Sequence, residues 1–453
     1  MKKFSLALIL AIMMTSSMVF AASIDYLSNQ SAKMMLTLSR TAATDNSADL
    51  ASFNPAATAT FAPGLYIDVS SQYLMKLYEQ DYTWPGASKE TVKQEEPTNY
   101  LPNFYAVYNA GQLGAGKLAG YLQLGIPAGG GTLKWDDGTV GTQNALFGIP
   151  ALLTGNPLAA QSPDSQSVEG TSLYYGIGFG VAYAAKDDIV SVSLGGRVLI
   201  GQKNLKLKGG YSPTGSLSGL SMSVDFDYSA TGFAPIIGFD VKPIENLTFA
   251  VRYEFETVMK FKYEENKIRD NMGGTFVPQI RSGLANNFGI GDGLEFKHNM
   301  PALLSLGVEY KVMPELTVLA SPTFYYLSQV QSGNDVFNSD WFGTGYDLSI
   351  GATYNVMREL KVGLGFTYTE MGVKDAYYES GDLTGTVQMP LSSFTIGCGG
   401  TYSVENIDVT LGFFWQHALA QSFDIPTVTG FSAKTEYRKD VISIGVGLGY
   451  KVF

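Results

Sequence analysis

The segment VISIGVGLGYKVF, residues 441–453, alternates between two kinds of side chain for more than ten residues. Large apolar side chains occupy every even position from Ile442 to Val452, and serine, glycine and lysine occupy the odd positions between them. A period of two places these sets on opposite faces of a β-strand. The apolar face covers either the core of a soluble sandwich or the lipid-facing side of a membrane barrel, whose small and polar side chains then face the lumen.

The same alternation recurs along the chain, for example at 220–228, 304–311, 348–355 and 360–368, with aromatic side chains near the ends of the apolar faces. In a barrel it would place Leu220, Met222 and Val224 toward lipid. The pattern predicts about fourteen strands, near 64–80, 99–110, 114–127, 170–186, 189–206, 219–241, 245–264, 294–311, 315–330, 344–356, 359–374, 386–404, 406–420 and 434–453.

The connections between these strands alternate strictly between long loops and tight turns, and the number of strands is even. Outer-membrane barrels show this arrangement, whereas a soluble sandwich has no reason to sort its loops. The sequence therefore favours an all-β fold, an antiparallel transmembrane β-barrel over residues 63–453.

The N-terminus indicates export. Lys2 and Lys3 precede an apolar run at 4–20, and small residues follow, which predicts a signal peptide at 1–21. The expected location is the outer membrane. The formal net charge of −11 argues against binding nucleic acid, and the single Cys398 cannot form an internal disulfide.

Residues 22–62 have no place in the strand alternation. Asp45, Asn46 and Ser47 are helix-capping residues, and Asn54-Pro55 stops the short helix that they begin. Because the lumen of a fourteen-stranded barrel is too wide for wall side chains to fill, we expect 22–62 to form a hatch that plugs the lumen.

The stretch TLSRTAATDNSADLASFNPAATATF, residues 37–61, resembles the N-terminal hatch of the FadL family of outer-membrane transporters for long-chain fatty acids and other hydrophobic compounds, including aromatic hydrocarbons. The family usually has glycine where this chain has Ala57. IPAGGG, residues 126–131, resembles the end of the family's third strand. The matching hatch residues are Arg40, Asp45, Asp49, Asn54, Pro55 and Ala56.

This resemblance implies a fourteen-stranded barrel, a hatch, a hydrophobic pocket near the N-terminus, and sideways release of ligand through a gap at a kinked third strand. Gly125 and Pro127 fall in that strand, and proline cannot donate to a β-ladder. They are the candidates for a lateral gate. Alternatively, Pro127 simply ends the strand.

Two apolar segments are candidates for ligand binding. The hatch segment 31–40 carries Met34, Met35, Leu36 and Leu38, and methionine suits irregular apolar ligands. The outer loop 144–160 carries Phe147, Leu152 and Leu153, which are too apolar for a solvated loop. Packing against the wall and over the barrel mouth, respectively, are the alternatives.

Among the predicted inward charges, Arg197 and Arg252 could attract a carboxylate head group or anchor Asp45 or Asp49. The two histidines, His298 and His417, have no nearby nucleophile motif, so we expect no enzyme activity. No metal-ligand motif occurs, and no cofactor is expected.

The sequence thus predicts a monomer for passive uptake of long-chain fatty acids or other hydrophobic small molecules. Its expected partners are that ligand, outer-membrane lipid and the outer-membrane assembly machinery. A polar-solute porin or a surface adhesin on the same barrel is the alternative, and the lining of the pocket, apolar or polar, would separate them.

Overall fold

The protein is represented by a computed structural model. It describes residues 29–94, 96–156, 160–212, 219–288, 291–329, 341–379, 383–426 and 432–453. The predicted signal peptide at 1–21 and the first hatch residues lie outside this part of the chain, so that assignment stays a prediction.

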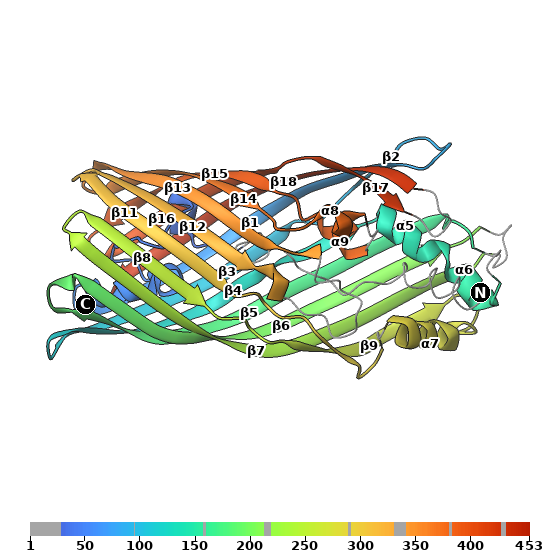
Figure 1. Ribbon diagram of the computed structural model, residues 1–453, viewed down its shortest axis with the longest axis horizontal. Coiled ribbons are helices and arrows are strands. Elements are labelled where there is room, and N and C mark those ends of the chain that lie inside the picture. Colours follow the sequence, from blue (N-terminus) through green and yellow to red (C-terminus); the bar gives the residue numbers. More distant parts are fainter. Residues whose placement is uncertain are drawn as a thin grey trace.

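Fourteen antiparallel strands form one closed barrel (Figure 1). The last strand pairs with the first from Tyr66↔Lys451 to Thr83↔Lys434, which closes the wall and confirms the predicted fold. Three barrel strands are each built of two consecutive segments, and one extra segment, β2, extends the sheet beside the first strand. The segments are β1 (Gly64–Thr83), β2 (Glu90–Lys93), β3 (Thr98–Leu113), β4 (Gly116–Trp135), β5 (Ser165–Ala185), β6 (Val190–Gly210), β7 (Ser221–Ile244), β8 (Leu247–Glu254), β9 (Lys260–Asp270), β10 (Glu295–Lys297), β11 (Leu303–Met313), β12 (Leu316–Tyr326), β13 (Thr344–Met357), β14 (Leu360–Glu370), β15 (Ser393–Val404), β16 (Ile407–Ala418), β17 (Gln421–Pro426) and β18 (Ser432–Lys451).

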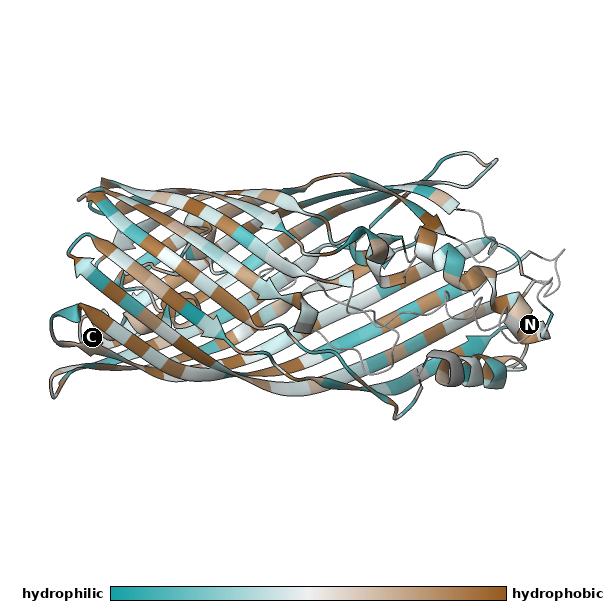
Figure 2. Ribbon diagram, in the orientation of Figure 1, coloured by the Kyte–Doolittle hydropathy of each residue, from teal (hydrophilic) through white to brown (hydrophobic). Residues whose placement is uncertain are grey.

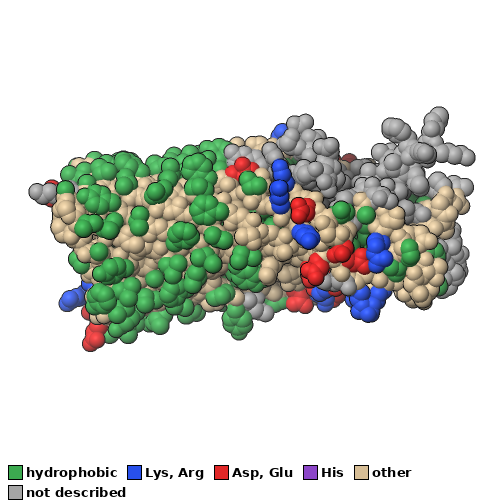
Figure 3. All heavy atoms as spheres, turned by 90° about the horizontal axis from the view of Figure 1, so that it is seen from below, with side chains coloured by type: hydrophobic (Ala, Val, Ile, Leu, Met, Phe, Trp, Pro, Cys, Tyr) green, Lys and Arg blue, Asp and Glu red, His purple; other side chains and the backbone are tan. Residues whose placement is uncertain are grey.

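A belt of exposed apolar side chains surrounds the half of the barrel that carries the short turns. Leu194, Leu364 and Leu411 are 64%, 62% and 60% exposed, although they are large and apolar. Apolar and small or polar residues alternate along the strands of this half (Figure 2), and the hydrophobic side chains gather there on the outer surface (Figure 3). Such a belt is the lipid-facing surface of a transmembrane barrel. No helix in the described ranges has the length and apolar character to cross a bilayer.

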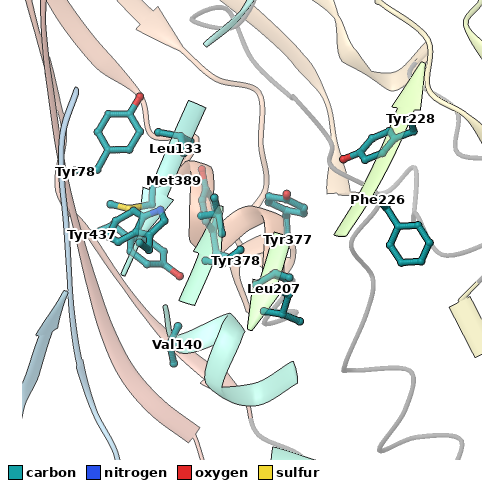
Figure 4. Close-up of a cluster of buried hydrophobic side chains, with 14 of the residues drawn as sticks. Tyr78, Leu133, Val140, Leu207, Phe226, Tyr228, Tyr377, Tyr378, Met389 and Tyr437 are labelled. Carbon is teal, nitrogen blue, oxygen red and sulfur yellow. The ribbon is translucent and has the colours of Figure 1, made fainter. Parts of the chain in front are cut away.

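The long-loop half of the barrel reverses this pattern, and one prediction is wrong there. Leu220, Met222 and Val224 are buried inside, whereas Ser221 and Ser223 of the same strand face outward. The wall extends beyond the apolar belt at this end, so its outer face meets water and its lumen is filled by loops and helices. Figure 4 shows part of this buried cluster, in which Leu207 and Tyr377 come from the wall and a loop helix.

Short helices close the barrel at this end (Figure 1). They are α5 (Val140–Phe147), α6 (Ile149–Thr154), η4 (Leu327–Gln329), α8 (Asp375–Tyr378) and α9 (Leu383–Gln388), with α7 (Val277–Phe288) packed beside β9 and α6, and η3 (Lys186–Asp188) in a turn at the opposite end. The predicted strand 386–404 begins only at Ser393, because α9 packs against α5 and Thr386 hydrogen-bonds the Oγ1 of the α5 cap, Thr139, at 2.9 Å.

The hatch lies in the lumen of the short-turn half and consists of α3 (Ala32–Thr37), α4 (Leu50–Phe53) and η1 (Pro55–Thr60) (Figure 1). Helix α3 contacts β13 to β16, whereas η1 contacts β4 to β7 across the lumen. The wall is glycine-rich opposite α3: a Cβ on Gly351 would lie 2.2 Å from the carbonyl oxygen of Thr37, and one on Gly365 would lie 2.3 Å from its carbonyl carbon. The glycines of the inward faces therefore let the hatch approach the wall backbone.

Candidate functional site

A buried ion cluster holds the hatch together. The Arg40 guanidinium donates to Asp45 and Asp49, at 2.8 Å each, and Ser31 Oγ donates to the second oxygen of Asp49 at 2.6 Å. Asp49 is fully buried. Burial lowers the pKa of Arg40, but the two carboxylates raise it by more than burial lowers it, so the guanidinium stays charged. Residues up to eighteen positions apart are thereby fixed in one compact unit.

Other polar contacts anchor the hatch to the wall. Lys33 Nζ lies 2.9 Å from Asp408 and 3.6 Å from Asp68, and the Asn54 amide donates to Asp240 at 3.0 Å. The predicted anchoring of Asp45 or Asp49 by Arg197 and Arg252 is wrong, because both arginines pair with Glu254 of the wall. A cavity between hatch and wall at the short-turn end is lined by eight charged side chains: Lys33, Arg40, Asp45, Asp68, Lys361, Glu405, Asp408 and Lys451.

A second cavity, the central cavity, lies between the hatch and the interior of the long-loop half. One part of its lining is apolar and comes from Met34, Leu38, Leu74, Tyr78, Phe414 and Val441. Another part carries hydroxyl groups and comes from Ser305, Ser321, Thr323, Ser349, Thr367, Thr369 and Thr395. Such a cavity suits a molecule with both an apolar and a polar part.

Six buried charged side chains line the central cavity: Arg40, Lys76, Arg197, Arg252, Glu254 and Asp347. Three of them form one cluster. Arg197 Nη1 donates to both carboxylate oxygens of Glu254, at 2.8 and 3.0 Å, and Arg252 Nη2 donates to one of them at 2.6 Å. All three side chains are less than a tenth exposed. Two guanidinium groups share one carboxylate, so the cluster carries one excess positive charge. Because an uncompensated buried charge is costly, the cluster favours an anionic group in the cavity.

The third barrel strand, β4, leaves its neighbour early. Pairing of β3 with β4 ends at Asn103↔Gly125, although β4 continues to Trp135. The pairing of β4 with β5 carries two register shifts, between Gly125 and Ala128 and between Ala128 and Gly131. Each shift inserts one extra residue, as a β-bulge does. The wall therefore has a gap in its backbone ladder on one side of β4.

Two prolines flank this gap. Pro102 precedes the last paired residue of β3, and Pro127 lies two residues beyond the last paired residue of β4. Neither has an N–H group, so neither can extend the ladder. Pro127 and Gly130 also line the central cavity, which therefore reaches the gap.

Comparisons with known proteins bear on the fold. No protein-family model matches the chain, and no curated protein matches it. Solved structures do match. A FadL homologue of Pseudomonas aeruginosa is 15% identical with a TM-score of 0.65, and the match covers 94% of this chain and 98% of that one.

The chain has the FadL fold. The Pseudomonas putida toluene transporter TodX matches at 14% identity and a TM-score of 0.56, over 89% of this chain and 94% of that one. The Ralstonia pickettii toluene transporter TbuX matches at 13% identity and a TM-score of 0.53, over 97% and 100%. These values establish the shared architecture and leave the ligand to be argued from this chain's own residues.

Of the four hatch residues predicted to bind ligand, Met34 and Leu38 line the central cavity, and Leu38 also lies against Gly397 of the wall. Met35 and Leu36 lie against wall glycines instead: their side chains lie within 3 Å of where a Cβ would stand on Gly445 and Gly399, respectively. Asn54 also donates to the carbonyl of Ala43, Pro55 begins η1, and Ala56 is fully buried.

The predicted capture loop packs over the mouth of the barrel. Phe147 is half-buried, Leu153 packs against the buried cluster of the long-loop half, and the side chain of Leu152 is outside the described part. A capture groove at this loop stays a prediction. His298 is buried, and His417 Nδ1 lies 2.9 Å from Asp440 on the outer face. The described residues contain no cluster of three metal-ligating side chains.

Sequence reasoning missed two contributors to the site. Lys33 is a buried lysine among the mostly apolar residues of α3. Its role as an anchor of the hatch follows only from the wall carboxylates Asp68 and Asp408 that face it. Pro102 carries a signal that could have found it, since a proline inside a predicted strand marks an interrupted ladder.

Proposed function

We propose that this protein carries an amphipathic carboxylate of the long-chain fatty acid class passively across the outer membrane. The ligand occupies the central cavity with its carboxylate at Arg197 and Arg252 and its tail along Met34 and Leu38. It leaves sideways through the gap beside β4. The protein works as a monomer in outer-membrane lipid, into which the assembly machinery inserts it.

The observation that carries this proposal is that one irregular stretch of β4 borders both the gap and the central cavity. The alternative route runs past the hatch toward the short-turn end. That route is lined by the ion pairs of Lys33, Arg40 and Asp408, and an apolar tail would have to strip water from them. A path through the wall into lipid avoids this desolvation.

The excess positive charge of this cluster favours a carboxylate ligand over an uncharged hydrocarbon. TodX and TbuX are toluene transporters by name, and toluene has no charge to neutralise. Here two guanidinium groups line the cavity and share Glu254. A fatty acid places its one negative charge beside a three-residue cluster that carries one excess positive charge.

Release through the gap can be tested by restoring a regular β-ladder between β4 and β5. Each register shift in β4 contains one extra residue, so deleting Pro127 and Gly130 together restores continuous register with β5. We expect uptake of radiolabelled oleate by cells to fall at least tenfold, while binding of oleate by the purified protein stays within threefold. Uptake at the wild-type rate from a normally assembled barrel would disprove release through the gap.

A polar-solute porin is the second candidate, and the charged cavity at the short-turn end favours it. It predicts a steady ion conductance in planar bilayers and no saturable binding of oleate. The proposed transporter predicts the opposite on both counts.

A further inference from the structure

A groove on the outer face of the wall, beyond the apolar belt, combines two cations with four hydroxyl groups. It lies at the long-loop ends of β5, β6, β7 and β9 and has a volume of about 540 Å³. Lys208 and Arg269 supply the cations. The serines are Ser165, Ser167, Ser221 and Ser223.

The strand register places these groups in one row. Lys208 lies between Ser167 and Ser223, and Ser223 lies opposite Arg269 on the next strand. Strands are about 4.8 Å apart, so the two cations stand about 10 Å from each other across the sheet. Hydroxyls and cations thus alternate along the floor of the groove.

The neighbouring row, two residues nearer the belt, has a different composition. There Lys206 lies between Glu169 and Asp225, and Asp225 lies opposite Lys267. Lys206 forms an ion pair with Glu169 at 2.7 Å. In this row the side chains beside the cations are carboxylates, which neutralise them. In the groove the corresponding positions are serines, which carry no charge.

The groove does contain two carboxylates, but both are engaged. Asp270 accepts the backbone N–H groups of Met272, Gly274 and Phe276 at 2.7–2.8 Å, and Asp136 pairs with Lys134 at 3.1 Å. Within the described ranges, neither Lys208 nor Arg269 forms an ion pair. The undescribed residues 213–218 of the adjacent loop contain no acidic residue. The cations are therefore available to an external anion.

The distance of the groove from the apolar belt restricts which membrane anions can reach it. Ile200 is the outermost belt residue of β6, eight positions before Lys208. At about 3.3 Å per residue and a tilt of about 40°, Lys208 stands about 20 Å beyond the belt. The head-group layer of a phospholipid leaflet is only about 5–8 Å thick. A phospholipid head group cannot reach the groove, whereas a long anionic saccharide on a glycolipid can.

We propose that the groove binds phosphate groups on the saccharide of an outer-leaflet glycolipid. Lys208 and Arg269 contact the phosphates, and the serines donate to phosphate and sugar oxygens. Arginine suits this role because its planar donors match phosphate oxygens. The site is distinct from the central cavity, and it holds the glycolipid against the barrel wall.

The test uses the purified protein in detergent and a water-soluble probe, the deacylated core oligosaccharide of lipopolysaccharide. The double variant Lys208→Ser/Arg269→Ser should lose at least tenfold in affinity, measured by calorimetry. The control Lys260→Ser/Lys297→Ser removes the same charge from exposed positions of the same wall near the belt, and should stay within twofold. A heat-dependent mobility shift on gels verifies that both variants are folded.

Three results would overturn the proposal. One is an equal loss of affinity in both double variants, which indicates unspecific attraction between charges. Another is undiminished binding of the oligosaccharide after enzymatic removal of its phosphates. The third is full displacement of the oligosaccharide by an equimolar amount of inorganic phosphate, which would assign the groove to the free ion.

Discussion

Replacing Arg252 by methionine removes the excess charge from the cluster of Arg197, Arg252 and Glu254 and leaves the pairing of Arg197 with Glu254 intact. Glu254 keeps Arg197 as a partner through two hydrogen bonds of 2.8 and 3.0 Å. The methionine fills much of the space of the arginine stem. The cluster becomes neutral, so we expect the barrel and the hatch to assemble normally.

The expected loss follows from the one interaction that is removed. A hydrogen bond to a charged group contributes about 1.5–3 kcal/mol. Since about 1.4 kcal/mol corresponds to one factor of ten, Arg252→Met should weaken binding of a C16 fatty acid by about 10- to 150-fold. The C16 alcohol has the same tail without the charge, and its affinity should change less than threefold.

Equilibrium dialysis of the purified protein in detergent against each radiolabelled ligand measures both affinities. Glu254→Gln supplies the opposite control, because it leaves two guanidinium groups without a carboxylate, and it should strengthen acid binding. The reasoning fails if acid and alcohol lose equally in Arg252→Met, or if Glu254→Gln weakens acid binding as Arg252→Met does.

The remaining predictions concern the hatch. Met34→Asp places a charge in the central cavity and should weaken fatty acid binding more than tenfold by dialysis, without raising the conductance of the protein in planar bilayers. Met35→Asp buries that charge against the wall instead, so it should raise conductance by unseating the hatch. Arg40→Met leaves Asp49 buried without its guanidinium, which costs about 3–5 kcal/mol for a broken buried pair; open-channel events should become frequent, and Arg40→Lys should partly suppress them. Deleting residues 22–62 should leave a barrel that shifts on gels with heating and conducts steadily, and an unchanged conductance would show that this segment does not close the lumen.

The strands and turns of the short-turn half were predictable because one physical rule governs them. Lipid on one side and a hatch on the other impose strict alternation, and tight turns fix the register. The predicted apolar positions at 360–368 and 442–450 do face outward. The hatch motif was also readable, since Arg40, Asp45 and Asp49 are close in sequence and meet in one cluster.

The long-loop half was harder because the rule reverses there without a change in pattern. The segment 220–228 alternates as a lipid-facing strand does, yet its apolar side points inward, since water lies outside the wall above the belt. Alternation gives two faces but does not say which one is inside. The height at which a strand leaves the membrane, which decides this, depends on neighbouring strands and cannot be read from the strand itself.

The partner of Arg197 and Arg252 was missed for a related reason. Arg252 and Glu254 lie two residues apart on the same inward face, a signal of a local pair, but Arg197 comes from a strand more than fifty residues earlier. The acidic hatch residues offered equally plausible partners by sequence alone. Only the strand register of the closed barrel identifies the partner. On the intervening strand β7, Ala234 lies opposite Arg197 and Gly238 lies opposite Arg252, so both arginines border the same short stretch of β7.

The placement of charge along the lumen unites the hatch, the cavity and the gap. Below the cavity, the hatch cations Lys33 and Arg40 are paired with carboxylates, so they offer little to an incoming anion and resist an apolar tail. At the cavity, the cluster of Arg197, Arg252 and Glu254 has one positive charge in excess, and the wall beside it lacks a continuous ladder. In the proposed function, a carboxylate with a long tail is thus attracted to the level of the gap and opposed beyond it. The sideways path that we propose follows from this balance of charges, because lipid beyond the gap is the nearest medium that accepts the tail without breaking an ion pair.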